Sequence, residues 1–217
     1  MKKVNIDKIN QILEKEVLKW KVPVAELIEV QTKDPFKVLV ATILSARTKD
    51  QTTAMVSKRL FKTVKKPKDL EKLSIKQLEK LLHPVGFYKN KAKFLKALPL
   101  KLKEFNNKIP KTIDELTTLP GVGRKTANLV VGVAFKTPAI CVDTHVHRIT
   151  NRLGYVKTTS PFKTEMALRK KLPKKYWISL NTYFVAFGQN LCNPISPWCS
   201  KCPIENYCNK INVKKSR

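Results

Sequence analysis

A lysine that follows a glycine-rich turn is the side chain in this sequence best placed for covalent chemistry. The stretch LPGVGRK occupies residues 119–125 and leads directly into the apolar run TANLVVGVAF. A helix N-terminus and the neighbouring Arg124 both favour the neutral, nucleophilic form of the Lys125 amine, because each opposes a further positive charge. Such an amine can attack an electrophilic carbon and form a Schiff base. A lysine beside a phosphate-binding turn can equally contact phosphate, and these residues leave both uses open.

The turn before this lysine has the composition of a phosphate-binding hairpin. Gly121 and Gly123 can adopt positive φ and carry no Cβ, so the backbone around Val122 can approach a phosphate closely. The helix that follows contributes the positive end of its dipole. Such a device grips a nucleic-acid backbone without reading bases. An ordinary turn between two helices is the alternative, but cations just past a helix N-terminus, such as Arg124, oppose its dipole and need another cause.

A carboxylate at the start of a later helix is the second candidate for chemistry. Three apolar residues form one helical face after it: Val146, Ile149 and Leu153. The spacing predicts a helix that begins near Asp143, which is then either a plain N-cap or a carboxylate held at a cleft. His145 and His147 lie two residues apart and point in different directions, which argues against a shared metal. We expect surface or DNA-facing roles for both histidines.

Four cysteines toward the end of the sequence have the spacing of metal ligands. They form the pattern C-x6-C-x2-C-x5-C at Cys192, Cys199, Cys202 and Cys208. A lysine-rich chain without a secretory signal pattern argues against a disulfide framework. Tetrahedral zinc and an iron-sulfur cluster are the two remaining interpretations, and a single short knuckle between longer loops favours the cluster. Cys141 stands apart and is typical of a buried apolar position.

The charge of the chain indicates what kind of partner it meets. Its 217 residues carry 44 Lys and Arg against 16 Asp and Glu, a formal net charge of +28. A polyanion is the natural partner, with nucleic acid first and an anionic membrane second. A lysine-rich proteome or adaptation to salt or heat is the alternative cause. No apolar run approaches the roughly 20 residues of a spanning helix, and we expect an intracellular, cytoplasmic protein.

Helical periodicity dominates the chain, and alternating strand patterns of useful length are absent. We therefore predict an all-α fold with short Gly- and Pro-containing connections. Ser74 with Gln77 has the spacing of a capping box, as does Thr112 with Glu115. The stretches at 81–95 and 118–131 both combine a helix end, a Pro- and Gly-containing turn, cations and an apolar helix. This echo suggests two helix-hairpin-helix units.

The motifs, in this order, resemble the endonuclease III family of iron-sulfur DNA glycosylases and AP lyases. LPGVGRKTA is followed eighteen residues after its lysine by VDTH and then by the four cysteines, and the likeness extends from about Asp34 to Cys208. The resemblance implies the helix-hairpin-helix DNA glycosylase fold with two domains. A six-helix barrel is expected at 30–135, with its hairpin at about 112–135. Residues 1–29 and 136–217 are expected to form the iron-sulfur cluster domain, with a cluster loop at 192–208 and the active site between the domains.

The resemblance also assigns roles to single residues. It makes Lys125 the nucleophile and Asp143 the essential carboxylate, and it implies a 4Fe-4S cluster held by Cys192, Cys199, Cys202 and Cys208. The implied activity is bifunctional: removal of oxidised or reduced pyrimidines from duplex DNA, then a nick 3' to the abasic site by β-elimination. The residues expected to contact DNA are Gly121, Val122, Gly123, Arg124, Arg47, Phe87, His145 and Lys201.

Two positions depart from the family pattern. Arg47 occupies the gap-filling position where Gln is common, and Phe87 occupies the wedge position where Leu is frequent. The loop 193–198 contains no cation, so we assign its phosphate contact to Lys201. We expect a monomer that acts on damaged double-stranded DNA of the nucleoid. The alternatives are a mismatch-specific or adenine-type glycosylase, whose members have a different residue in place of Lys125, and a non-enzymatic iron-sulfur DNA-binding module.

Overall fold

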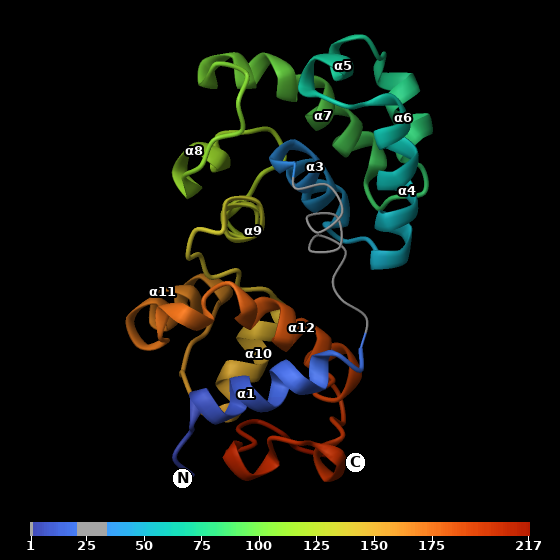
Figure 1. Ribbon diagram of the computed structural model, residues 1–217. Helices are drawn as coiled ribbons and strands as arrows, with labels where there is room; N and C mark the ends of the chain where they lie inside the picture. Colours follow the sequence, from blue (N-terminus) through green and yellow to red (C-terminus); the bar gives the residue numbers. More distant parts are fainter. Residues whose placement is uncertain (1, 21–33) are drawn as a thin grey trace. The chain divides into compact units, whose positions relative to one another are not determined.

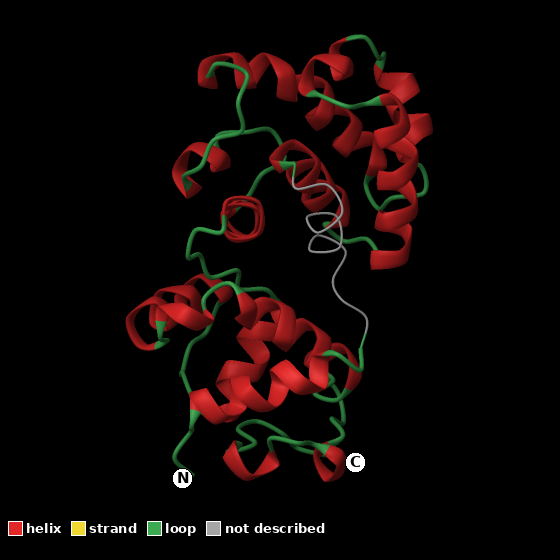
Figure 2. Ribbon diagram, viewed as in Figure 1, coloured by secondary structure: helices red, strands yellow, loops and turns green. Residues whose placement is uncertain are grey.

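The computed structural model describes residues 2–20 and 34–217, and every regular element in those residues is a helix (Figure 2). The all-α prediction is therefore confirmed for the described part of the chain. No helix there has the length and apolar character needed to cross a bilayer. The chain divides into two compact units, one made of residues 24–137 and the other of residues 1–23 and 138–217.

The unit at 24–137 is organised around an apolar central helix. Its helices are α3 (Pro35–Ser45), α4 (Asp50–Thr63), α5 (Pro67–Glu71), α6 (Ile75–Leu82), α7 (Tyr88–Leu102), η1 (Lys103–Phe105), α8 (Ile113–Thr117) and α9 (Arg124–Phe135). α3 buries eight of its side chains and packs against α4, α7 and α9 (Figure 1). Helix pairs α6 with α7 and α8 with α9 also pack together, each pair joined by a short turn. Both predicted helix-hairpin-helix segments thus form helix pairs.

The second unit brings the two ends of the described chain together. Its helices are α1 (Ile6–Val17), α10 (Thr144–Leu153), α11 (Pro161–Lys171), η2 (Lys174–Tyr176), α12 (Ser179–Asn190), η3 (Cys199–Lys201) and η4 (Glu205–Tyr207). α12 packs against both α1 and α10 (Figure 1). Its Phe184 and Phe187 are almost fully buried, together with Ile9 and Leu13 of α1. Burial of apolar side chains therefore joins segments about 170 positions apart.

Side-chain caps determine where several of these helices begin. The Ser74 hydroxyl accepts from the Gln77 N–H while the Gln77 side chain accepts from the Ser74 N–H, which is the predicted capping box. Thr112 accepts from the Glu115 N–H at the start of α8. Asp143 caps α10, so the predicted start of that helix is confirmed. Each cap satisfies backbone donors that the helix itself leaves unpaired.

Candidate functional site

Lys125 is the second residue of α9, and its side chain is exposed. The N-cap of this helix is Gly123, which provides no side chain to bond the first backbone N–H groups. The first helical hydrogen bond runs from the Ala127 N–H to the Gly123 carbonyl over 2.9 Å. The lysine amine is therefore carried by the positive end of a helix whose N-cap does not shield it.

The two glycines before α9 have different conformations. Gly121 has φ +75°, and a Cβ there would lie 2.5 Å from a ring carbon of Phe94. Gly123 has φ −91° and an extended backbone, and a Cβ there would meet nothing within 4 Å. Of the two glycines that can adopt positive φ, only Gly121 does so. The turn itself needs Gly121, whereas Gly123 leaves open space toward the outside of the hairpin.

Val122, between these glycines, faces inward. Its side chain is 6% exposed, and its backbone N–H donates to the Leu119 carbonyl over 3.1 Å. Val122 therefore closes the turn with its N–H, and the contact with DNA expected of this residue stays a prediction. Arg124, the first residue of α9, is half-buried. Any anion at this hairpin is met by the glycine backbone and the first turn of α9.

Asp50 is an acidic neighbour of Lys125 that the sequence analysis missed. It is the first residue of α4, and partial desolvation of its carboxyl group raises its pKa, an effect that the nearby positive charge of Lys125 partly offsets. Lys125 therefore has a carboxyl group of its own unit within electrostatic reach. The sequence contains no signal for this pairing, because an acidic residue in the first turn of a helix is common. The two residues are also 75 positions apart in the sequence.

Asp143 has well-defined hydrogen bonds at the start of α10. Its Oδ1 accepts from the backbone N–H groups of His145 and Val146, both over 2.9 Å. The side chain is half-buried, and the two bonds hold its carboxylate in one orientation. Asp143 belongs to the unit at 138–217 and Lys125 to the unit at 24–137. Both are helix-start residues of their own units.

The two histidines of α10 occupy different environments. The His145 Nδ1 lies 3.1 Å from the Arg148 guanidinium, and a side chain at Gly188 would overlap the imidazole. The His147 Nδ1 lies 2.6 Å from the Thr164 hydroxyl. His147 thus contacts α11 of its own unit while its side chain stays partly exposed. His145 is the histidine nearer the Asp143 cap.

Arg47 and Phe87 form an exposed pair in the other unit. The Arg47 guanidinium lies 5.3 Å from the centroid of the Phe87 ring, a cation–π distance. Phe87 is 58% exposed although it is a large apolar side chain. Both residues adopt the left-handed backbone conformation, with φ of 53° and 56°. Because this conformation is costly for residues with a Cβ, the surrounding contacts must stabilise the backbone at both residues.

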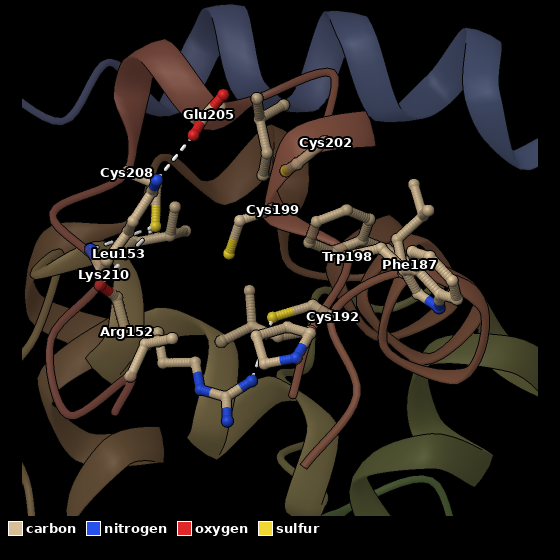
Figure 3. Close-up of a pocket in the computed structure, with 15 residues that line it drawn as sticks. Arg152, Leu153, Phe187, Cys192, Trp198, Cys199, Cys202, Glu205, Cys208 and Lys210 are labelled. Atoms are coloured by element: carbon tan, nitrogen blue, oxygen red, sulfur yellow. Dashed lines mark hydrogen bonds and ion pairs between the residues drawn. The ribbon is translucent and has the colours of Figure 1, made fainter. Parts of the chain in front are cut away.

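The four predicted cysteine ligands line a single pocket (Figure 3). Apolar residues complete its wall, among them Leu153, Phe187 and Trp198. Burial raises the pKa of the Cys202 thiol to about 12 and also raises that of Cys208, whereas a bound metal would favour the thiolates. The described residues nevertheless contain no group of ligands arranged to hold a single metal ion. The four sulfur atoms thus share one pocket, and the kind of metal group that it holds stays a prediction.

Two arginines of α10 support this cysteine pocket. Arg152 donates to the Cys192 Sγ over 3.4 Å and to the carbonyls of Asn193 and Pro194, each over 2.6 Å. Arg148 donates to the Cys192 carbonyl over 2.8 Å. Both arginines thereby hold the beginning of the loop that connects Cys192 to the next cysteine.

The last residues of the sequence lie along the same loop. The Arg217 N–H donates to the Pro197 carbonyl over 2.8 Å, and the Ser200 N–H donates to the Arg217 carbonyl over 2.9 Å. The Arg217 guanidinium lies 4.1 Å from the Trp198 ring centroid, and the Lys201 amine lies 4.9 Å from it. Lys214 and Lys215, both exposed, line a neighbouring pocket with Ile195. The loop that lacks cations therefore has cations beside it.

Comparison with known proteins identifies the class of protein to which these helix pairs and this glycine hairpin belong. The family model described as "HhH-GPD superfamily base excision DNA repair protein" matches residues 40–174. The helical pairs, the glycine hairpin and this match define a helix-hairpin-helix base-excision repair protein.

Similar proteins and solved structures identify the family within this class of repair proteins. Endonuclease III of Thermotoga maritima is 45% identical over 176 residues, which cover 81% of this chain and 83% of that protein. The structure is similar to a non-covalent endonuclease III–DNA complex, with a TM-score of 0.84, 36% identity and 94% of each chain covered. It is also similar to a trapped endonuclease III–DNA covalent intermediate, with a TM-score of 0.79, 35% identity and 95% and 97% coverage. This chain belongs to the endonuclease III family.

The contrast between the two glycines predicts different effects of Gly121→Ala and Gly123→Ala on stability. Gly121→Ala should lower the free energy of unfolding by about 1–2 kcal/mol, because an L-residue is strained at positive φ and the new methyl group meets Phe94. Gly123→Ala, the matched control, should change it by less than about 0.5 kcal/mol, because an extended backbone accepts Ala. Urea unfolding followed by circular dichroism measures both. Equal loss in the two variants would contradict the assigned conformations.

Proposed function

We propose that this protein is a bifunctional DNA glycosylase and AP lyase that acts on oxidised or reduced pyrimidines and on abasic sites in duplex DNA. The observation that carries the proposal is the exposed Lys125 in the first turn of α9, directly after the glycine hairpin. Membership of the endonuclease III family supports it, as does similarity to structures solved with DNA. The net charge of +28 suits a phosphate-rich partner.

In the proposed reaction, the neutral Lys125 amine attacks the sugar C1' of a flipped nucleotide. A C–N bond forms while the glycosidic bond breaks, and its electron pair leaves with the damaged base. The amine loses its proton, and we assign to Asp143 the family role of the carboxylate that assists this loss and stabilises positive charge that develops on the sugar. The hairpin at Gly121 and Gly123 holds a backbone phosphate meanwhile.

Strand cleavage follows from the same covalent intermediate. Opening of the sugar ring gives a Schiff base between Lys125 and C1', which acidifies the C2' protons. Loss of a C2' proton to a base drives cleavage of the C3'–O bond, and the 3' phosphate leaves with the electron pair. Water then hydrolyses the Schiff base and restores the lysine. A residue other than lysine at this position, as in mismatch-specific and adenine-type glycosylases, offers no amine for this step.

The cysteine pocket is proposed to hold a 4Fe-4S cluster through Cys192, Cys199, Cys202 and Cys208. Its support is the pocket that the four cysteines share, together with membership of a family for which this cluster is expected. When bound, the cluster contributes cross-linking of the loop and no bond cleavage. Arg148 and Arg152 fix the loop from the protein side.

The cations beside the cluster loop are proposed to contact DNA phosphates. Lys201 and Arg217 lie against Trp198, and Lys214 and Lys215 lie close to the same loop. The backbone bonds of Arg217 to Pro197 and Ser200 hold the end of the chain on the loop. Cations from a segment distant in sequence can thus replace those absent from residues 193–198.

Removal of the Lys125 amine should abolish covalent trapping. Lys125→Ala, incubated with abasic-site duplex and borohydride, should form less than about 1% of the wild-type adduct, because no other group is proposed to form the Schiff base. Lys76→Ala, which removes an exposed lysine of α6, is the matched control and should trap like the wild type. Asp143→Asn keeps an N-cap for α10 and should slow trapping roughly 100-fold. Equal adduct formation by wild type and Lys125→Ala would rule out the lyase mechanism.

The identity of the metal group is tested by absorbance and metal analysis. The wild type should be brown, with a charge-transfer band near roughly 400 nm and about four irons per chain. Cys202→Ala should lose the band and the iron, whereas Cys141→Ala, a buried cysteine outside the pocket, should retain both. One zinc per chain and no visible band would contradict the cluster.

The cations beside the cluster loop should contribute to salt-dependent DNA binding. Replacement of Lys214, Lys215 and Arg217 by Ala should make the slope of log K for DNA association against log salt concentration shallower by about 2–3. Each phosphate contact contributes about 0.9 to this slope. The control replaces three exposed lysines of the same unit, Lys163, Lys170 and Lys174, and leaves the slope nearly unchanged. Binding titrations with undamaged duplex measure both variants. Equal slopes for the two variants would show that only total charge matters.

A further inference from the structure

Lys91 of α7 is a buried lysine bonded to oxygen atoms of another segment. Its side chain is 4% exposed, and its amine donates to the carbonyls of Leu44 and Ala46 over 2.8 and 2.6 Å and to the Thr48 hydroxyl over 3.2 Å. Lysine is rarely buried this deeply, because desolvation of its charge is costly. A buried amine with three acceptors therefore indicates a specific task.

The acceptors lie where α3 ends and the chain turns toward α4. The last carbonyls of a helix lack partners within it, and an ammonium group there also complements the helix dipole. Arg47 follows in the left-handed conformation, with φ of 53°, between two of the residues that Lys91 contacts. The lysine thus bonds the backbone carbonyl of the residue before Arg47 and the side-chain hydroxyl of the residue after it.

Thr48 connects this turn to the segment before α7. Its hydroxyl accepts from the Lys91 amine and from the Gly86 N–H over 3.1 Å, and it donates to the Ala46 carbonyl over 3.3 Å. These bonds use its single donor and both lone pairs. A side chain at Gly86 would overlap the Arg47 carbonyl, so the two segments are in direct contact. Hydrogen bonds through Thr48 therefore join the turn that carries Arg47 to the turn that carries Phe87.

Lys91 also lies on the helix that Phe87 begins. Phe87 is the N-cap of α7, and its carbonyl accepts from the Lys91 N–H over 3.1 Å. The lysine backbone is thus bonded to Phe87, while its side chain bonds both neighbours of Arg47. We propose that Lys91 is a positioning residue that presents Arg47 and Phe87 as one stacked pair for insertion into the duplex at the lesion. This inference rests on the proposed function and deepens it.

Insertion of a preformed pair explains why two costly backbone conformations persist. An exposed cation and an exposed aromatic ring can fill the space of a displaced nucleotide and stack on neighbouring bases. Flexible side chains would lose conformational freedom at that step, whereas a clamped pair has already lost it. Burial lowers the pKa of Lys91 to about 8, so the ammonium form predominates in an assay at neutral pH.

Trapping on two substrates tests this role. For Lys91→Met, the borohydride trapping rate on abasic-site duplex should fall roughly 10–100-fold, as expected from misplaced contacts. On single-stranded abasic DNA, where no opposite base leaves a gap, the rate should change less than about 2-fold, since the chemistry at Lys125 needs no insertion. Lys96→Met is the matched control on the same helix, since the Lys96 amine also donates to helix-end carbonyls, those of Glu71 and Leu73. It should leave both rates unchanged.

A spectroscopic measurement reports insertion directly. With 2-aminopurine opposite a non-cleavable tetrahydrofuran abasic analogue, wild-type binding should change the fluorescence, and Lys91→Met at saturating concentration should recover less than about half of that change because stacking is lost. Thr48→Val keeps side-chain shape but removes the bridging hydroxyl. It should also reduce the fluorescence change, but by less than Lys91→Met does. It provides the test if Lys91→Met does not fold.

Three results would be decisive against the inference or its basis. Equal losses on duplex and single strand would assign Lys91 to the general fold, and an unchanged duplex rate would show that no clamp is needed. Either result would overturn the positioning role while the lyase activity of the wild type stands. Absence of an adduct from the wild type on both substrates would instead overturn the proposed function itself.

Discussion

Positive charge in this chain exceeds what its acidic residues can neutralise, because it has 44 basic side chains and 16 acidic ones. Most cations must therefore remain in solvent or find neutral acceptors. The strongest neutral acceptors in a helical protein are the carbonyls at helix C-termini, which lack partners and carry the negative end of the dipole. The described residues use cations from other elements at four such ends: Arg59 at α6, Lys91 at α3, Lys96 at α5 and Arg148 at α12.

This use of cations connects charge to the placement of functional loops. The α3 end is followed by Arg47, the α6 end by the turn that holds Phe87, and the α12 end by Cys192. In each case the capping cation lies on a different helix, so it fixes both the terminus and the chain that leaves it. The opposite ends of helices carry the two residues proposed to do the chemistry, with Lys125 in the first turn of α9 and Asp143 at the N-cap of α10. Helix ends thus carry the candidate site.

Local patterns made the helix starts predictable, whereas contacts between distant segments were hidden. The capping box at Ser74 and the N-cap at Asp143 depend on residues within one turn, so spacing identified them. The helix pairs and the family were likewise recognisable from short motifs. The different conformations of Gly121 and Gly123 were not, because glycine permits a wide backbone range and the sequence does not show which part of it each residue adopts. The burial of Lys91 was invisible because its acceptors are about 45 positions away.

The use of carbonyl partners by Lys91 affects the charge that this part of the protein presents to a polyanion. A carboxylate partner for Lys91 would satisfy the buried amine, but it would place a negative charge beside the two side chains proposed to enter DNA. Backbone carbonyls satisfy the same donors and leave the formal charge of the lysine uncompensated, so its field adds to that of Arg47. The cost is desolvation of an ammonium group, which the lowered pKa of Lys91 records. In the proposed role, this cost in stability gives a rigid and positively charged pair of Arg47 and Phe87, as is typical of sites whose conformation must be fixed before the ligand arrives.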